Sequence, residues 1–143
     1  MRIALASDHA GFKLKESLKE HLVEAGHDVS DLGVSSEERC DYPPYARDAA
    51  SRVARGAVDF GLLVCGSGIG MCIAANRVAG VRAAVLRDGF DAEMSRRHND
   101  ANIACLGGRV TGEKAAALLV DLFLSTPFEG GRHERRVRQI DSK

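Results

Sequence analysis

Short, nearly continuous apolar runs alternate along this chain with segments that repeat apolar residues at helical spacing. Four apolar runs cover residues 2–6, 58–65, 81–86 and 101–107, and a short, more polar strand is expected at 27–33. Strands read as continuous apolar runs when helices cover both faces of a parallel sheet. The alternation therefore predicts an α/β fold, a three-layer α/β/α sandwich on a five-stranded parallel sheet.

Helices are expected between these runs, and two of them have recognisable ends. Asp8 can cap the first, over residues 7–27, and Gly26 can end it. Thr111 is expected to cap a helix with four large apolar residues on its inner side, Leu118, Leu119, Leu122 and Phe123. The other helices are expected at residues 45–55, 67–78, 88–97 and 131–140.

Length and charge exclude several classes of protein. The chain has 143 residues, which fits a single domain over residues 1–143. Its 20 Lys and Arg residues balance 20 Asp and Glu residues, so no overall positive field draws it to nucleic acid or to an anionic membrane. Its apolar runs are shorter than a bilayer span, and MRIALASDHAG turns polar too early for a secretory signal. We therefore expect a cytoplasmic protein.

The four cysteines show neither the Cys-x-x-Cys spacing of zinc sites nor a disulfide framework. We expect free thiols, no bound metal, and a packing role for Cys72 and Cys105.

Cys65 has a different setting, because it ends an apolar strand and precedes the glycine-rich turn Gly66–Gly70. A turn that opens a helix offers unpaired backbone N–H groups, which stabilise a thiolate and any anion beside it. In parallel sheets, ligands bind at the carboxyl ends of the strands. The pattern predicts that Cys65 meets Ser7-Asp8-His9 and Gly107-Gly108-Arg109 at that edge.

Each of these features also has a purely structural interpretation. The glycines can simply serve a tight turn, with Cys65 as a small buried residue. Gly66, Gly68 and Gly70 form GxGxG in the third strand–helix unit, which does not match the dinucleotide fingerprint of a first unit, so NAD is not expected.

The polar candidates elsewhere leave the same choice open. His9 can contact a ligand, or it can be an exposed residue beside a helix cap. His98 and Asn99 can form a polar functional cluster, or His98 can simply stabilise the end of a helix. Arg132 and Arg136 share one helical face and suit a phosphate, although a solvated terminal helix explains them equally.

Taken together, five ordered motifs resemble those of the ribose-5-phosphate isomerase B family, which includes enzymes for allose 6-phosphate and galactose 6-phosphate. The motifs are SDHAG, DYPPYA, CGSGIGMCIAANRVAGVRAA, RRHNDANIACLGGR and GGRHERRVRQI, and they span nearly the whole chain. The resemblance implies a Rossmann-like fold and a metal-free, cofactor-free aldose–ketose isomerase. It also implies dimers, in some members dimers of dimers, whose sites take the basic helix at about 131–140 from a second subunit.

The resemblance also implies a role for each candidate residue. Cys65 matches the catalytic base, His98 the ring-opening acid, and Ser67 a donor to the enediolate. The implied substrate-binding residues are Asp8, His9, Tyr42, Gly66, Gly68, Ile69, Gly70, Asn99, Arg109, Arg132 and Arg136. Ser67 replaces a common threonine and Cys72 a common serine, and the glycine turn lacks the glutamate that some members use as base.

The expected reaction is therefore interconversion of ribose 5-phosphate and ribulose 5-phosphate through a cis-enediolate, with no cofactor. Two alternatives stay open at the level of sequence: an isomerase of a 6-phosphohexose, and a protein that binds a sugar phosphate without turning it over.

Overall fold

A computed structural model of the chain describes residues 1–142. Its five strands form one sheet in the order β2-β1-β3-β5-β4, and every neighbouring pair is parallel. The strands are β1 (Arg2–Ser7), β2 (Asp28–Asp31), β3 (Phe60–Cys65), β4 (Ala83–Val85) and β5 (Ile103–Gly107). The predicted five-stranded parallel sheet is confirmed.

Six α-helices and one short 3-10 turn connect or follow the strands. The helices are α1 (Phe12–Glu24), α2 (Pro43–Ala54), α3 (Ile69–Ala75), α4 (Gly89–Arg97), α5 (Glu113–Ser125) and α6 (Arg132–Asp141), and the 3-10 turn η1 covers His9–Gly11. Within residues 1–142, no helix combines the length and the apolar character that crossing a bilayer requires.

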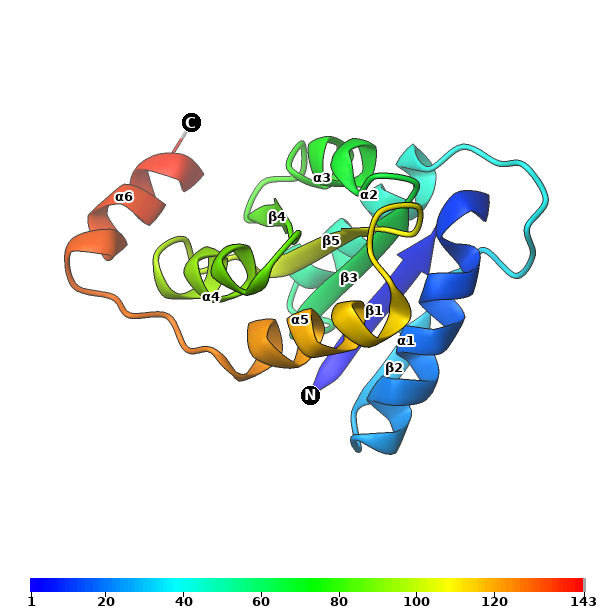
Figure 1. Ribbon diagram of the computed structural model, residues 1–143. Coiled ribbons are helices and arrows are strands. Elements are labelled where there is room, and N and C mark those ends of the chain that lie inside the picture. The colour runs from blue at the N-terminus through cyan, green and yellow to red at the C-terminus, as the bar shows by residue number, and fades with distance from the viewer. Residues whose placement is uncertain (143) are drawn as a thin grey trace.

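The helices form two layers, one on each face of the sheet (Figure 1). Helices α2 and α3 pack on one face over a cluster of small residues rich in alanine. Helices α1, α4 and α5 cover the other face, where Phe123 meets Phe60 edge-on with ring centroids 5.7 Å apart. The sheet is buried on both sides, which explains why its strands read as continuous apolar runs.

The chain reverses its winding direction between β1 and β3. From β1 it passes to β2 at one edge, then crosses back to β3 on the other side of β1. Such a reversal leaves a crevice at the carboxyl ends of the two strands. Here those ends are Ser7 and Cys65, with Gly107 of β5 directly beside Cys65.

The first helix ends near Gly26 as predicted, but it begins later than predicted, at Phe12. The Asp8 side chain accepts a hydrogen bond from the Gly11 N–H and so caps η1, which leads directly into α1. Gly26 ends the helical region with φ of +83°, a left-handed conformation that glycine adopts without strain.

Three local predictions were wrong. Thr111 does not cap α5: its N–H closes a turn onto the Gly107 carbonyl, and Gly112 occupies the cap position without a side-chain bond. Leu118 is 70% exposed, because the buried stripe of α5 runs through Ala116, Leu119, Val120, Phe123 and Leu124 instead. The helix expected over 67–78 is α3 alone, since Gly68 in the left-handed conformation holds the chain in a turn before it.

Helix α6 lies apart from the two layers, beyond α4 and at the end of an extended connection from α5 (Figure 1). Only His133 and Val137 of this helix are buried. One ion pair ties its end to the body of the molecule, between Arg82 Nη1 and Asp141 at 2.7 Å.

Candidate active site

A cavity of about 770 Å³ opens over the carboxyl ends of β1, β3 and β5. Nine of the predicted site residues line it: Asp8, His9, Tyr42, Cys65, Gly66, Ser67, Ile69, Gly70 and Arg109. Gly68 is buried in the same turn. We call these ten residues the pocket set. Their meeting point is the edge that strand direction predicted for the ligand site.

Cys65 ends β3 with only 4% of its surface exposed. The backbone N–H of Gly68 donates a hydrogen bond to its Sγ at 3.2 Å. Gly68 has φ of +80°, which folds the turn back so that this N–H faces the sulfur. A donor aimed at sulfur stabilises the thiolate relative to the thiol, and the thiolate is the basic form.

The turn also packs closely against its surroundings. A Cβ added at Gly70 would lie 2.5 Å from Cζ of Tyr42, and one at Gly107 would lie 2.9 Å from the Ser67 main chain. These glycines let the β5 loop and the Tyr42 ring approach the turn directly. Gly68 donates its N–H to Cys65, and Ile69 donates its N–H to Ser67 Oγ at 3.3 Å. The other N–H groups of residues 66–70 are held in a fixed array, suited to an anion.

Two acid–base side chains from the end of β1 complete one wall of the cavity. Asp8 is 6% exposed, and its Oδ1 accepts from the Gly11 N–H at 3.1 Å. His9 Nδ1 lies 3.2 Å from the carbonyl oxygen of Cys40 and 3.3 Å from its backbone nitrogen. These contacts anchor one ring nitrogen of His9 and leave the other for a ligand.

Arginines supply positive charge at the same mouth. Arg109 follows β5, and its guanidinium lies over Gly66 at the start of the turn. A Cβ added at Gly66 would be only 3.2 Å from Nη1 of Arg109. Arg39 also lines the cavity, together with Tyr42. Arg39 was not predicted from the sequence, because a single arginine in a polar loop carries no pattern that distinguishes it from a solvated one.

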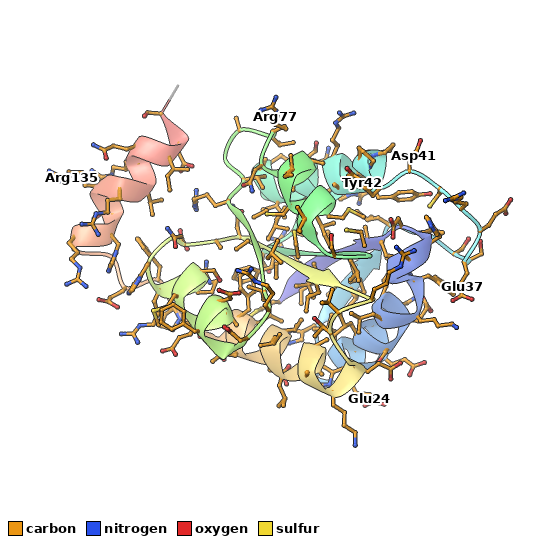
Figure 2. The ribbon with its side chains drawn as sticks, turned by 45° about the horizontal axis from the view of Figure 1, so that its top comes forward. Glu24, Glu37, Asp41, Tyr42, Arg77 and Arg135 are labelled. Atoms are coloured by element: carbon orange, nitrogen blue, oxygen red, sulfur yellow. The ribbon has the colours of Figure 1, made fainter. Side chains whose placement is uncertain are left out.

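The remaining four predicted residues do not line this cavity. His98 and Asn99 follow α4, and Arg132 and Arg136 lie on the exposed surface of α6. We call these four the distal set. Figure 2 labels Tyr42 on one side of the molecule and Arg135 of α6 on the opposite side.

Strand direction explains the separation. His98 and Asn99 precede β5, so they lie at the amino edge of the parallel sheet, whereas Cys65 lies at the carboxyl edge. A strand of five residues such as β5 puts about 16 Å between those edges. Within a single copy of the chain, His98 and Cys65 therefore lie at opposite edges of the sheet.

The turn that carries His98 and Asn99 is organised around Asp100. This residue has φ of +46°, the only positive φ of a non-glycine residue among residues 1–142. Its two carboxylate oxygens bind Arg96 at 2.7 Å and Arg82 at 3.1 Å. Arg82 also donates to the Asn99 carbonyl and pairs with Asp141 of α6, so one network holds both the turn after α4 and the last helix.

Cys72 packs against the core as predicted, and it also has a perturbed thiol. A hydrogen bond with Cys105 is the main cause that lowers the pKa of Cys72 to about 7, against the effect of burial, and Asn76 contributes. Cys105 is fully buried, and burial raises its pKa. Cys105 therefore behaves as the predicted packing residue, and Cys72 is a half-buried thiol with thiolate character near neutral pH.

Comparisons with known proteins agree with this architecture. The family model described as Ribose/Galactose Isomerase matches residues 3–140. Ribose-5-phosphate isomerase B of Escherichia coli is 49% identical over 97% of this chain and 93% of its own length.

Solved structures give the same result. A ribose-5-phosphate isomerase B from Clostridium thermocellum superimposes with a TM-score of 0.97 at 45% identity, covering 99% of this chain and 95% of that one. The Mycoplasma genitalium enzyme with bound ribulose-5-phosphate has a TM-score of 0.94 at 41% identity, covering 98% and 93%. With a matching family model and full-length relatives of this similarity, the chain belongs to the ribose/galactose isomerase family.

Proposed function

We propose that this protein interconverts ribose 5-phosphate and ribulose 5-phosphate. The observation that carries the proposal is the buried Cys65 sulfur, which accepts an N–H from Gly68 at the floor of a polar cavity. The Mycoplasma genitalium relative with bound ribulose-5-phosphate supports the choice of substrate.

The reaction begins with ring opening. His98 donates a proton to the ring oxygen while the bond from that oxygen to C1 breaks, and the C1 hydroxyl releases its own proton to solvent. Asp8 and Tyr42 hold sugar hydroxyls, and Asn99 orients the open chain. A histidine suits this step, because its imidazole ring can both donate and accept a proton.

Proton transfer between the two carbons follows. The Cys65 thiolate takes the proton from C2, and the electron pair forms the C1–C2 double bond of an enediolate with negative charge on O1. The thiol then returns the proton to C1 while the O2 proton passes to O1, which leaves a ketone at C2. Ser67 and the N–H groups of the turn that are not bonded to Cys65 or Ser67 stabilise the anion, at about 3 kcal/mol per donor.

The phosphate requires several cations, and they come from both sets. His9 and Arg109 belong to the pocket set, while Arg132 and Arg136 lie on α6. Paired arginines on one helical face bind a phosphate monoester through several charge-assisted bonds.

We assign the distal set of each site to a second copy of the chain. Two observations support a dimer with shared sites: the distal set lies at the opposite edge of its own sheet, and apolar side chains are exposed beside the cavity. Those side chains are Ile69 and Ile73, one turn apart on α3, and Val110. A cluster of exposed apolar residues around a polar cavity marks a protein interface.

Mixed dimers test this assignment. Cys65→Ala and His98→Asn chains carrying different tags are co-expressed, and the mixed dimer is isolated through both tags. If each site combines Cys65 of one copy with His98 of the other, one site of the mixed dimer is intact and about half of wild-type turnover returns. If the sites were confined to single chains, the mixed dimer would be as inactive as either parent.

The parent proteins test the reaction itself. Wild type is expected to convert ribose 5-phosphate in the presence of a chelator, and Cys65→Ala is expected to bind the substrate without converting it. A parallel assay with allose 6-phosphate shows whether the site also accepts a sugar phosphate that is one carbon longer. A wild-type protein without turnover of either sugar would overturn the proposal.

A further inference from the structure

His133 is a buried histidine for which the proposed reaction has no role. It is 4% exposed, and its Nε2 has no hydrogen-bond partner among the described residues. A buried polar atom without a partner costs about 1–3 kcal/mol, so such atoms call for a physical reason.

The surroundings of that nitrogen are other metal-binding side chains. Oε1 of Glu129 lies 3.8 Å from His133 Nε2. The ring of His98 stacks on the ring of His133, with centroids 4.1 Å apart and an angle of 13° between the planes. One ligand atom from each of the three residues lies within 4.8 Å of the other two.

We propose that His98, Glu129 and His133 form a binding site for a divalent transition metal of the Zn²⁺ class. Two imidazoles and one carboxylate are a known ligand set for Zn²⁺, with bonds of about 2.0–2.2 Å, and softer or harder cations prefer other donors. The fourth position of a tetrahedral site is left for water.

The His98 ring must turn out of its stack on His133 to share an ion with it, because the lone pairs of two parallel rings do not converge. Ligand atoms around a tetrahedral Zn²⁺ lie about 3.4 Å apart, so the present spacing must shrink by roughly an ångström. Glu129 is exposed and His98 is partly exposed, so both can rotate toward the buried His133 nitrogen. Arg97 holds the other carboxylate oxygen of Glu129 at 3.0 Å, which leaves Oε1 directed at the site.

The sequence contained a weak sign of this site. Glu129 and His133 are four residues apart, the spacing of neighbours on one helical face, but Gly130 and Gly131 lie between them and do not indicate a helix. His98 lies at the end of α4, far away in the sequence. The expectation of no metal ligands rested on cysteine spacing, which does not bear on a histidine–carboxylate set.

Metal binding at this site has a consequence for catalysis, which rests on the proposed function. A metal occupies a lone pair of the His98 ring and binds only the deprotonated donor nitrogen. His98 then cannot supply the proton that opens the sugar ring. The site would make the isomerase sensitive to inhibition by free Zn²⁺, with recovery when a chelator removes the ion.

Cobalt binding to the full-length, chelator-treated protein tests the site directly. Wild type is expected to bind Co²⁺ with the visible absorption of a tetrahedral complex, and Zn²⁺ is expected to displace it. His133→Phe keeps an aromatic ring stacked on His98 but lacks the nitrogen. It is expected to weaken Co²⁺ binding by at least roughly tenfold, as is Glu129→Gln, whose exposed side chain does not contribute to the core.

Two controls separate this site from cobalt binding elsewhere on the protein. His21→Asn removes a different histidine beside a carboxylate, Asp121 at 2.7 Å, and is expected to leave Co²⁺ binding unchanged. A near-ultraviolet thiolate-to-cobalt band would reveal binding at a cysteine instead. Absent Co²⁺ binding by wild type, or equal binding by wild type and His133→Phe, would overturn the proposal.

The activity measurement is separate. His133→Phe is expected to keep its turnover of ribose 5-phosphate and to resist a Zn²⁺ concentration that inhibits wild type. Failure of wild type to turn over sugar would refute the isomerase function but leave the cobalt result to decide on the metal site.

Discussion

In the pocket set, main chain packs on main chain, whereas the turn and the helix that carry the distal set are held by ion pairs of neighbouring side chains. Gly68 donates to Cys65 and packs against the backbone of Leu106, all below the surface. Asp100, by contrast, is held by two arginines near the surface. Backbone groups cannot rotate away, so the pocket set is preorganised for catalysis, while the distal set is suited to binding across an interface.

The largest expected effect is on the pocket side. Cys65→Ala should lower kcat by roughly 10²–10⁴-fold, the usual contribution of a general base, with little change in affinity for ribose 5-phosphate. Steady-state kinetics and substrate binding by calorimetry measure both quantities. Near-normal turnover would mean that another group moves the proton.

A substitution in the distal set should lower the affinity for substrate instead. Arg132→Ala removes charge-assisted bonds to the phosphate and should raise KM by roughly 10–100-fold, with a smaller change in kcat. Arg135→Ala is the matched control, because this side chain lies on the same helix but is directed away from the body of the molecule (Figure 2). If the two substitutions had equal effects on KM, Arg132 would not bind the phosphate and α6 would be only a solvated helix.

The network that holds the distal set can be tested separately. Asn tolerates the positive φ of residue 100, so Asp100→Asn isolates the loss of the bonds to Arg82 and Arg96. We expect a loss of about 1–3 kcal/mol in the free energy of unfolding, measured with urea. The variant should also open closed-ring substrate more slowly, and an unchanged rate would show that His98 does not depend on this network.

Acid should weaken an ion pair on the pocket side of the sheet. Burial raises the pKa of Asp31, but hydrogen bonds from Lys15, Lys19 and the Gly33 N–H outweigh it and lower the pKa to about 2. Because the folded pKa lies below the ordinary aspartate value of 3.8, Asp31 stabilises the fold above about pH 4, and this stabilisation is lost as pH falls toward 2.

Urea unfolding of wild type and Asp31→Asn between pH 5 and pH 2 measures this contribution. The difference in unfolding free energy should shrink by about 1–2 kcal/mol over that range, after allowance for solvent screening. If the difference in unfolding free energy between wild type and Asp31→Asn did not change with pH, the contribution of Asp31 would come from packing and not from its charge.

The smallest effect concerns a thiol outside the cavity. Because the pKa of Cys72 is lowered to about 7, Cys65→Ala should still react with iodoacetamide near neutral pH. Adding Cys72→Ser should abolish that reaction, as counted by mass spectrometry, and Cys72→Ser alone should keep its turnover. Persistent labelling of the double variant would identify Cys40 as the reactive thiol.

The sequence predicted the sheet and the pocket set because both follow from local patterns. Apolar runs mark the strands, and strand direction brings Asp8, Cys65 and Arg109 to one edge. The end of the helix over 88–97 was also predicted, but its position before β5 was not used to place His98 at the other edge. The role of His98 was predicted only from the family resemblance, which did not indicate which copy of the chain provides this residue to a given site.

Other features could not be read from the sequence. Thr111 is a good capping residue in general, but the turn onto Gly107 uses its N–H before the helix begins. The stacking of His133 on His98 depends on how α6 returns to α4 across an extended connection, and no spacing rule describes that path.

The backbone construction of the glycine turn limits how the protein can evolve new preferences. Every residue type except proline carries the same N–H group. In the proposed reaction, substitution therefore cannot adjust the backbone donors and can only break the turn that holds them. Adaptation to a longer or differently branched sugar must therefore proceed through the few side chains at the rim, such as Ser67, Tyr42, Ile69 and Val110. Related enzymes can then share one chemical step while their substrates diverge.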